Sequence, residues 1–151
     1  MPIREAKADD LDAILSIQNR APEAAQWSQA DYAYLRSDPL GLILVVELDG
    51  SSPSTLAGFA AFHRVLDEAE LRNMAIDPAQ QRRGLGRELL AEGLRRLLEL
   101  GVKHLFLEVR ASNFAAQRLY SSAGFVIHSR RKDYYSDPRE DGLVLSWSTP
   151  R

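Results

Sequence analysis

The chain has 151 residues, of which 45% are hydrophobic and 26% charged, and we expect one globular domain over residues 1–151. Its net charge of -2 gives no general attraction for nucleic acid or an anionic membrane, so neither is expected as a direct partner. The chain has no cysteine, which excludes disulfides and thiolate catalysis, and its three histidines lack metal-ligand spacing. Without an apolar run of roughly 18 residues or a signal-peptide profile, we expect a cytoplasmic protein.

The first third of the chain predicts one short strand and two helices. Residues 2–7 form the strand, and apolar residues recur at helical spacing over 10–19 after an acidic start. Ser28 and Asp31 have the spacing of a capping box, which predicts a second helix toward Arg36.

Three strands are predicted next. An almost unbroken apolar run at 42–48 indicates a buried strand. Residues 49–54 are rich in turn formers, and their Asp-Gly start is typical of a hairpin. Strands at 55–65 and 69–76 follow, and Asp77-Pro78 ends the second of them.

The apolar period becomes helical after Gly84, and Gly101 ends this long helix. Its predicted apolar stripe consists of Leu85, Leu89, Leu90, Leu94, Leu97 and Leu98. Residues 103–110 then alternate as in a strand, with Phe106 and Glu108 on the more polar face.

The last third of the chain predicts a short helix and two closing strands. Ser112-Asn113 caps the helix, whose apolar stripe includes Tyr120. Strands at 125–130 and 143–147 flank a polar loop at 131–141. The whole order, β-α-α-β-β-β-α-β-α-β-β, predicts a mixed α/β fold whose central, mostly antiparallel sheet is flanked by about four helices.

A glycine-rich turn at 81–86 joins the third strand of the meander to the long helix. The first N–H groups of that helix lack intrahelical partners and lie at the positive end of its dipole, so the turn is a candidate phosphate site. Arg82, Arg83 and Arg87 add positive charge. The turn lacks the P-loop pattern and the third glycine of the dinucleotide fingerprint. The alternative is a structural turn with surface arginines.

This turn, QRRGLG at 81–86, resembles the Q/R-x-x-G-x-G/A acetyl-CoA motif of the GCN5-related N-acetyltransferases, the GNAT superfamily. Further segments resemble the bacterial ribosomal-protein-alanine N-acetyltransferases of the RimI type, namely LDEAEL at 66–71, NMAIDP at 73–78, LEVRASN at 107–113, LY at 119–120 and RKDYY at 131–135. The resemblance covers most of the chain. It implies the GNAT fold, acetyl-CoA as acetyl donor and an amine as acceptor; the lack of cysteine and of metal-ligand spacing among the histidines predicts no metal.

The resemblance also implies roles for individual residues. The implied cofactor-binding residues are Met74, Ala75, Ile76, Arg82, Arg83, Gly84, Leu85, Gly86, Arg87 and Asn113. Glu108 resembles the family's general base, and Tyr120 resembles the general acid that protonates the departing thiolate. A tyrosine of ordinary pKa, ~10, can donate a proton at neutral pH. The alternatives are a solvated carboxylate on a strand and a packed core ring.

We therefore predict transfer of an acetyl group from acetyl-CoA to a protein N-terminal α-amine, by direct attack in a ternary complex. The resemblance implies the N-terminal alanine of a ribosomal protein as acceptor. Acidic residues at 67–70 are candidates to attract a basic peptide, and Tyr134 and Tyr135 are candidates for the wall of its cleft. Two alternatives stay open: the same chemistry on a lysine side chain or a small-molecule amine, and a non-catalytic acetyl-CoA-binding module.

Overall fold

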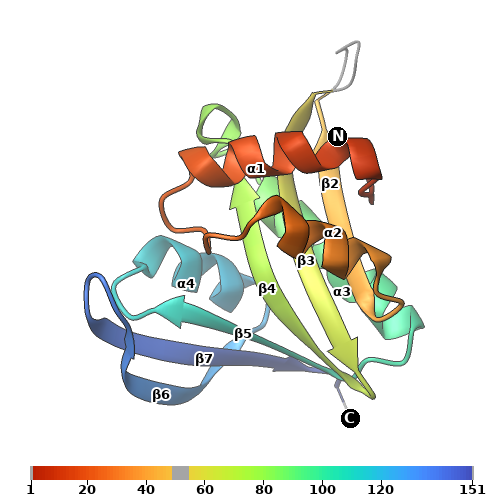
Figure 1. The fold of residues 1–151 in the computed structure, drawn as a ribbon. Coiled ribbons are helices and arrows are strands. Elements are labelled where there is room, and N and C mark those ends of the chain that lie inside the picture. The colour runs from red at the N-terminus through yellow and green to blue at the C-terminus, as the bar shows by residue number, and fades with distance from the viewer. Residues whose placement is uncertain (1, 49–54, 151) are drawn as a thin grey trace.

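The computed structural model describes residues 2–48 and 55–150, and within them the elements follow the predicted order (Figure 1). The strands are β1 (Ile3–Glu5), β2 (Gly41–Glu47), β3 (Leu56–Val65), β4 (Glu68–Ile76), β5 (His104–Arg110), β6 (Val126–Tyr135) and β7 (Glu140–Ser148). The helices are α1 (Leu11–Arg20), α2 (Gln29–Ser37), α3 (Leu85–Glu99) and α4 (Phe114–Ser122), with short 3-10 turns η1 (Ala8–Asp10) and η2 (Pro78–Gln80). The predicted hairpin turn at 49–54 lies outside the described residues.

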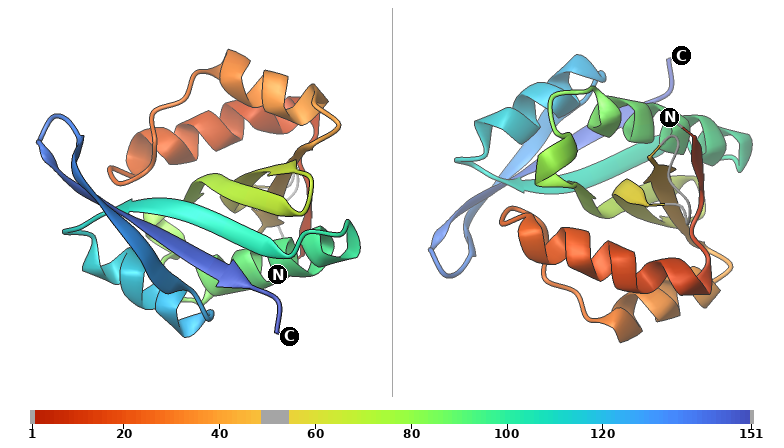
Figure 2. Two further views of the ribbon diagram at one scale, coloured as in Figure 1. Left: turned by 90° about the horizontal axis from the view of Figure 1, so that it is seen from below. Right: turned by 90° about the horizontal axis from the view of Figure 1, so that it is seen from above.

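The strands form one mixed sheet in the order β1-β2-β3-β4-β5-β7-β6. Every neighbouring pair is antiparallel except β4 and β5, which are parallel. Helices α1 and α2 cover one face, and α3 and α4 cover the other (Figure 2). The predicted mixed, mostly antiparallel sheet flanked by helices is therefore confirmed.

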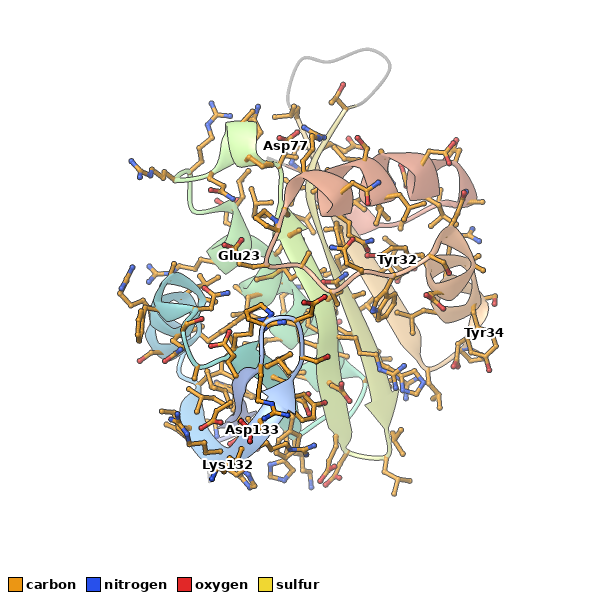
Figure 3. The ribbon with its side chains drawn as sticks, turned by 60° about the vertical axis from the view of Figure 1, so that its left-hand side comes forward. Glu23, Tyr32, Tyr34, Asp77, Lys132 and Asp133 are labelled. Carbon is orange, nitrogen blue, oxygen red and sulfur yellow. The ribbon has the colours of Figure 1, made fainter. Side chains whose placement is uncertain are left out.

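Local signals set the helix boundaries. The Ser28 side chain accepts from the Asp31 N–H at 3.2 Å, and the Asp31 carboxylate accepts from the Ser28 N–H at 2.8 Å, so the predicted capping box opens α2. The helix turns Tyr32 into the layer against the sheet and leaves Tyr34 outside (Figure 3). In the part of the chain that the structure describes, no helix is both long and apolar enough to cross a membrane.

Two predictions about the second half of the chain are wrong in detail. Leu98 belongs to the predicted stripe of α3, yet its side chain is 40% exposed, because it lies at the margin of that stripe. The predicted polar loop at 131–141 is mostly strand: β6 continues to Tyr135 and β7 begins at Glu140. Backbone pairing with β7 holds β6 extended although nearly all of its side chains are exposed.

Strands β4 and β5 separate along their length, as Figure 1 shows. Their parallel pairing joins only residues 68–71 of β4 to residues 104–107 of β5. Beyond Leu71, β4 stays paired with β3, and β5 stays paired with β7. A gap therefore opens in the middle of the sheet, and one edge of β4 faces it.

A β-bulge at Arg72 coincides with the start of this gap. Asn73 pairs with Ala61, while Leu71 pairs with the next residue, Phe62, so Arg72 has no partner on β3. Before the bulge, Leu71 faces the core under α3 and α4; after it, Ala75 faces the core under α1 and α2. The extra residue reverses which face of the sheet each later side chain of β4 meets.

Candidate active site

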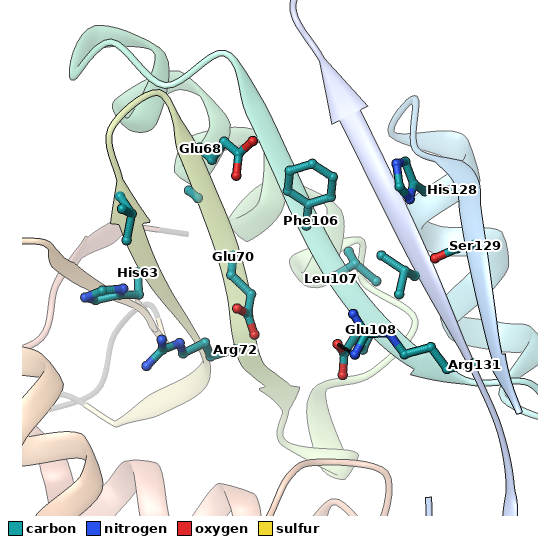
Figure 4. Close-up of a pocket in the computed structure, with 13 residues that line it drawn as sticks. His63, Glu68, Glu70, Arg72, Phe106, Leu107, Glu108, His128, Ser129 and Arg131 are labelled. Carbon is teal, nitrogen blue, oxygen red and sulfur yellow. Dashed lines mark ion pairs between the residues drawn. The ribbon is translucent and has the colours of Figure 1, made fainter. Parts of the chain in front are cut away.

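A pocket of about 360 Å³ lies over the first half of β4 and the middle of β5, beside the gap (Figure 4). Because successive side chains of a strand point to opposite faces, the polar sides of both strands meet there. Its charged and aromatic lining includes Glu68, Glu70, Arg72, Phe106, Glu108, His128 and Arg131. Two of the three acidic residues expected to attract a peptide, Glu68 and Glu70, thus lie in the pocket lining.

Glu108 lies in this pocket on β5, with 28% of its side chain exposed. Its carboxylate is 3.6 Å from the guanidinium of Arg131 on β6. The same carboxylate raises the pKa of Tyr134, first through a hydrogen bond that favours the protonated phenol and then through its charge. Glu108 is therefore a half-buried carboxylate held between a cation and a phenol, as opposed to the fully solvated group of the alternative reading.

Tyr120 is buried on α4, and its ring packs against Phe125 with 5.8 Å between the centroids. Burial raises the pKa of its phenol well above the ordinary value, with a further contribution from Tyr135. Burial and the charge of Glu108 in turn raise the pKa of Tyr135 to about 12. Tyr135 thus interacts electrostatically with both Tyr120 and Glu108. Its ring also stacks under the Arg110 guanidinium at 4.5 Å.

The free edge of β4 presents backbone groups to the gap. The Asp77 N–H donates to the Ala57 carbonyl at 2.8 Å, toward β3. Because backbone groups alternate sides along an antiparallel strand, those of Ala75 also face β3, and those of Met74 and Ile76 face the gap. Two of the three implied pantetheine-binding residues can therefore pair with a ligand as a neighbouring strand would.

The glycine-rich turn has the backbone geometry of an anion site. Arg82 and Gly84 both have positive φ, 67° and 75°, on either side of Arg83. Such alternation turns successive N–H groups toward one concave side. Gly84 is the N-cap of α3 and has no side chain to cap it, so the first N–H groups of the helix are open to a ligand. Arg82, Arg83 and Arg87 are exposed around them.

Three other residues implied in cofactor binding also have structural roles. Gly86 allows α3, α4 and β4 to approach: a Cβ there would be 3.3 Å from Leu119 and about 4 Å from Ile76 and Met74. Leu85 is buried in the core under α3 and α4. Asn113 caps α4, its Oδ1 accepting from the Ala116 N–H at 3.1 Å, so its Nδ2 group and one lone pair of Oδ1 are left for a ligand.

Sequence reasoning missed Arg72 and Arg131, both of which line the pocket. The pairing of Arg131 with Glu108 depends on β6 being a strand, which its exposed polar sequence does not indicate. The bulge at Arg72, which turns Asn73 to the same side of the sheet, also has no sequence signal. Within the described ranges, no group of three or more histidine or acidic residues is placed to hold a metal ion.

Comparison with known proteins supports the resemblance seen in the sequence. The chain matches the model of the acetyltransferase (GNAT) family over residues 9–125. It is 39% identical over 146 residues to the ribosomal protein bS18-alanine N-acetyltransferase of Escherichia coli K12, covering 95% of each chain. The crystal structure of the ribosomal-protein-S18-alanine N-acetyltransferase from Escherichia coli has a TM-score of 0.88 and covers 99% of this chain and 94% of that one. A Salmonella typhimurium structure containing its cofactor acetyl-CoA shares the fold, with a TM-score of 0.82 at 22% identity over 100% of this chain and 95% of that chain.

Proposed function

The chain belongs to the GNAT family of acetyltransferases and is an acetyl-CoA-dependent N-acetyltransferase, and we propose that its acceptor is the N-terminal alanine of a ribosomal protein in the cytoplasm. Glu108 acts as general base and Tyr120 as general acid. The observation that carries this proposal is the position of Glu108, a half-buried carboxylate in a pocket beside the free edge of β4.

The described residues fit acetyl-CoA in two places. The C=O of Met74 and the N–H and C=O of Ile76 face the gap and match the amide groups of a pantetheine arm, while the Met74 N–H donates to the Asn73 Oδ1. The uncapped start of α3, with Arg82, Arg83 and Arg87 around it, matches a pyrophosphate. When bound, acetyl-CoA supplies an acetyl thioester, whose carbonyl carbon is the electrophile.

Glu108 has the task of making the acceptor amine nucleophilic. An ammonium group has no lone pair, so it must lose a proton before attack. A free α-amine has a pKa of ~7.7–8.0, against ~10.4 for a lysine side chain, so an α-amine asks less of a carboxylate base near neutral pH. Glu108 removes this proton directly or through one water. Its place beside the gap favours attack within a single ternary complex.

Tyr120 returns a proton at the other end of the reaction. Among the described residues, no fully buried side-chain oxygen lacks a hydrogen-bond partner, and the Tyr120 hydroxyl makes no bond to the described protein atoms, so that hydroxyl is not fully enclosed. The ring is packed and the hydroxyl has no partner in the described protein, which leaves it free to donate a proton to a departing thiolate. Burial keeps the phenol protonated by raising its pKa.

The pocket lining favours a polypeptide acceptor with basic residues near its terminus. Three glutamates, Glu68, Glu70 and Glu108, line it against two arginines, Arg72 and Arg131. The side chain of one of the arginines, Arg131, is already paired with Glu108. Glu68 and Glu70 can attract positive charge on the residues that follow the amine.

The proposal is tested by mass spectrometry after incubation with acetyl-CoA. Three acceptors are compared: a basic peptide with a free N-terminal alanine, the same peptide with a blocked terminus and one internal lysine, and spermidine. Acetylation of the free α-amine alone is expected. Modification of only the internal lysine would indicate a lysine side chain as the acceptor. Modification of only spermidine would indicate a small-molecule amine. Binding of acetyl-CoA without any product would instead indicate a binding module.

A further inference from the structure

A buried polar cluster lies behind the pocket, where α1, α2 and β4 meet. Three side chains form it, Gln18 of α1, Tyr32 of α2 and Asn73 of β4. The Tyr32 hydroxyl donates to the Gln18 Oε1, and the Asn73 Nδ2 donates to the Tyr32 hydroxyl at 2.8 Å. Buried polar groups are costly unless all of them are paired, so this cluster calls for an explanation beyond core packing.

The cluster binds the backbone of the segment between α1 and α2. Asn73 makes two bonds with Ala25: its Oδ1 accepts from the Ala25 N–H at 3.0 Å, and its Nδ2 donates to the Ala25 carbonyl at 3.0 Å. The Gln18 Nε2 donates to the Trp27 carbonyl at 2.9 Å. One asparagine thus binds both backbone groups of an exposed residue, as a neighbouring strand would.

The bulge at Arg72 explains how Asn73 reaches this position. If Arg72 occupied a regular position in the ladder, Asn73 would face the same side as Leu71, the leucine core under α3 and α4. With the bulge, Asn73 and Arg72 both face the α1 and α2 side, Arg72 in the pocket and Asn73 buried behind it. The Asn73 Oδ1 also accepts from the Met74 N–H at 3.1 Å, which fixes the orientation of the amide.

Residues 25–27, which these hydrogen bonds hold, lie next to the pocket proposed to bind the acceptor. Trp27 packs on Tyr32 with 4.9 Å between ring centroids, and it lines a second pocket together with His63 and Arg72. His63 and Arg72 also line the pocket of Glu108, so the two pockets adjoin. The position of Trp27 relative to Glu108 therefore depends on what ties residues 25–27 to β4.

We infer that Asn73 is a positioning residue for the acceptor. Its hydrogen bonds hold the α1–α2 segment against β4 at the bulge, and they thereby fix the position of Trp27 in the surface against which the acceptor polypeptide binds. This inference depends on the proposed function for the identity of the acceptor. Asn73 touches neither substrate nor the reacting atoms in this role; it acts through the backbone of Ala25.

The test compares Asn73→Ala and Asn73→Asp with Asp10→Asn. Asp10 is another buried polar residue of the described chain, and its bonds to Arg4 and to the Lys7 N–H lie away from the pocket. Asn73→Asp keeps the size of the side chain but loses the donor to Ala25, so it serves where Asn73→Ala folds poorly. For each variant we measure the peptide KM and kcat, the acetyl-CoA Kd, the Tm, and the hydrogen exchange of the amides at 21–28.

We expect both Asn73 variants to raise the peptide KM at least fivefold and to speed exchange at 21–28, with the acetyl-CoA Kd within twofold of wild type. Asp10→Asn should lower the Tm without changing the peptide KM. A peptide KM that stays constant in the Asn73 variants, or rises equally in Asp10→Asn, overturns the inference. If the wild type acetylates no peptide, the proposed acceptor fails, and unchanged exchange at 21–28 then separately overturns the role of Asn73 in holding the segment.

Discussion

Replacing Tyr120 with phenylalanine separates the packing of the ring from the chemistry of its hydroxyl. The ring packs in the core under α3 and α4 and against Phe125, and phenylalanine retains those contacts. The hydroxyl makes no hydrogen bond with the described protein atoms, so its loss leaves no buried partner unsatisfied. We expect the Tm of the variant to stay within about 2 °C of wild type, which corresponds to under about 1 kcal/mol for a chain of this size.

The expected effect on turnover is much larger. Loss of a positioned general acid typically lowers the rate by about 10²–10⁴-fold, or roughly 2.7–5.5 kcal/mol of transition-state stabilisation. Release of the CoA thiol, followed with a thiol-reactive dye at saturating peptide, gives kcat, and calorimetry gives the acetyl-CoA Kd. We expect the loss to fall on kcat, with the Kd within twofold of wild type.

Phe125→Leu is the matched control, because it disturbs the packing beside the ring and keeps the hydroxyl. It should lower the Tm while kcat stays within about fivefold of wild type, in contrast to the loss expected for a missing general acid. Since burial raises the pKa of Tyr120, its ionisation should not lower the wild-type kcat up to pH 9. A kcat within threefold of wild type in Tyr120→Phe would refute the assignment and leave the thiolate to be protonated by water or Tyr135.

Glu108→Gln should lower kcat by about 10²-fold or more at pH 7, with less loss at pH 9, where the α-amine is already deprotonated; a pH-independent loss would contradict its role as base. Gly84→Ala meets no atom within 4 Å, but φ of 75° costs an alanine about 1 kcal/mol, so acetyl-CoA should bind up to about fivefold more weakly in a calorimetric titration. Hydrogen bonding to Arg4 lowers the pKa of Asp10, so this pair stabilises the fold above about pH 4 and the stabilisation is lost as the pH falls through the lowered pKa. The Tm deficit of Asp10→Asn should therefore be several degrees at pH 7 and shrink toward pH 2; an equal deficit at both would exclude the ionic contribution.

Much of the fold follows from local patterns in the chain. The alternation at 103–110 places Glu108 on the polar face of β5, and the capping residues Ser28 and Asn113 mark the starts of two helices. These signals are readable because each depends on neighbours within one or two turns of the backbone.

Features that depend on distant pairing were not predictable in this way. Strand β6 has no apolar period because it is exposed at the edge of the sheet, and only its ladder with β7 brings Arg131 to Glu108. The bulge at Arg72 also has no sequence signal, because buried and exposed residues continue to alternate along the strand on both sides of it. The Asn73 cluster was missed for the same reason, since its partners are 41 to 55 positions away along the chain.

The bulge makes the match in length between β3 and β4 matter more than the identity of the extra residue. Arg72 is exposed and unpaired with β3, so exchanging its side chain leaves the strand in phase. Deleting Arg72 would close the bulge, because Leu71 and Asn73 already pair with the neighbouring residues Phe62 and Ala61, and every later residue of β4 would keep its present face. A residue added to β3 opposite Arg72 would do the reverse: the Asn73 amide would face the leucine core, and Met74 and Ile76 would exchange faces with Ala75. The face that each later side chain of β4 meets is therefore set by the one-residue mismatch between β3 and β4 at Arg72, and the side chain of Arg72 has no part in it.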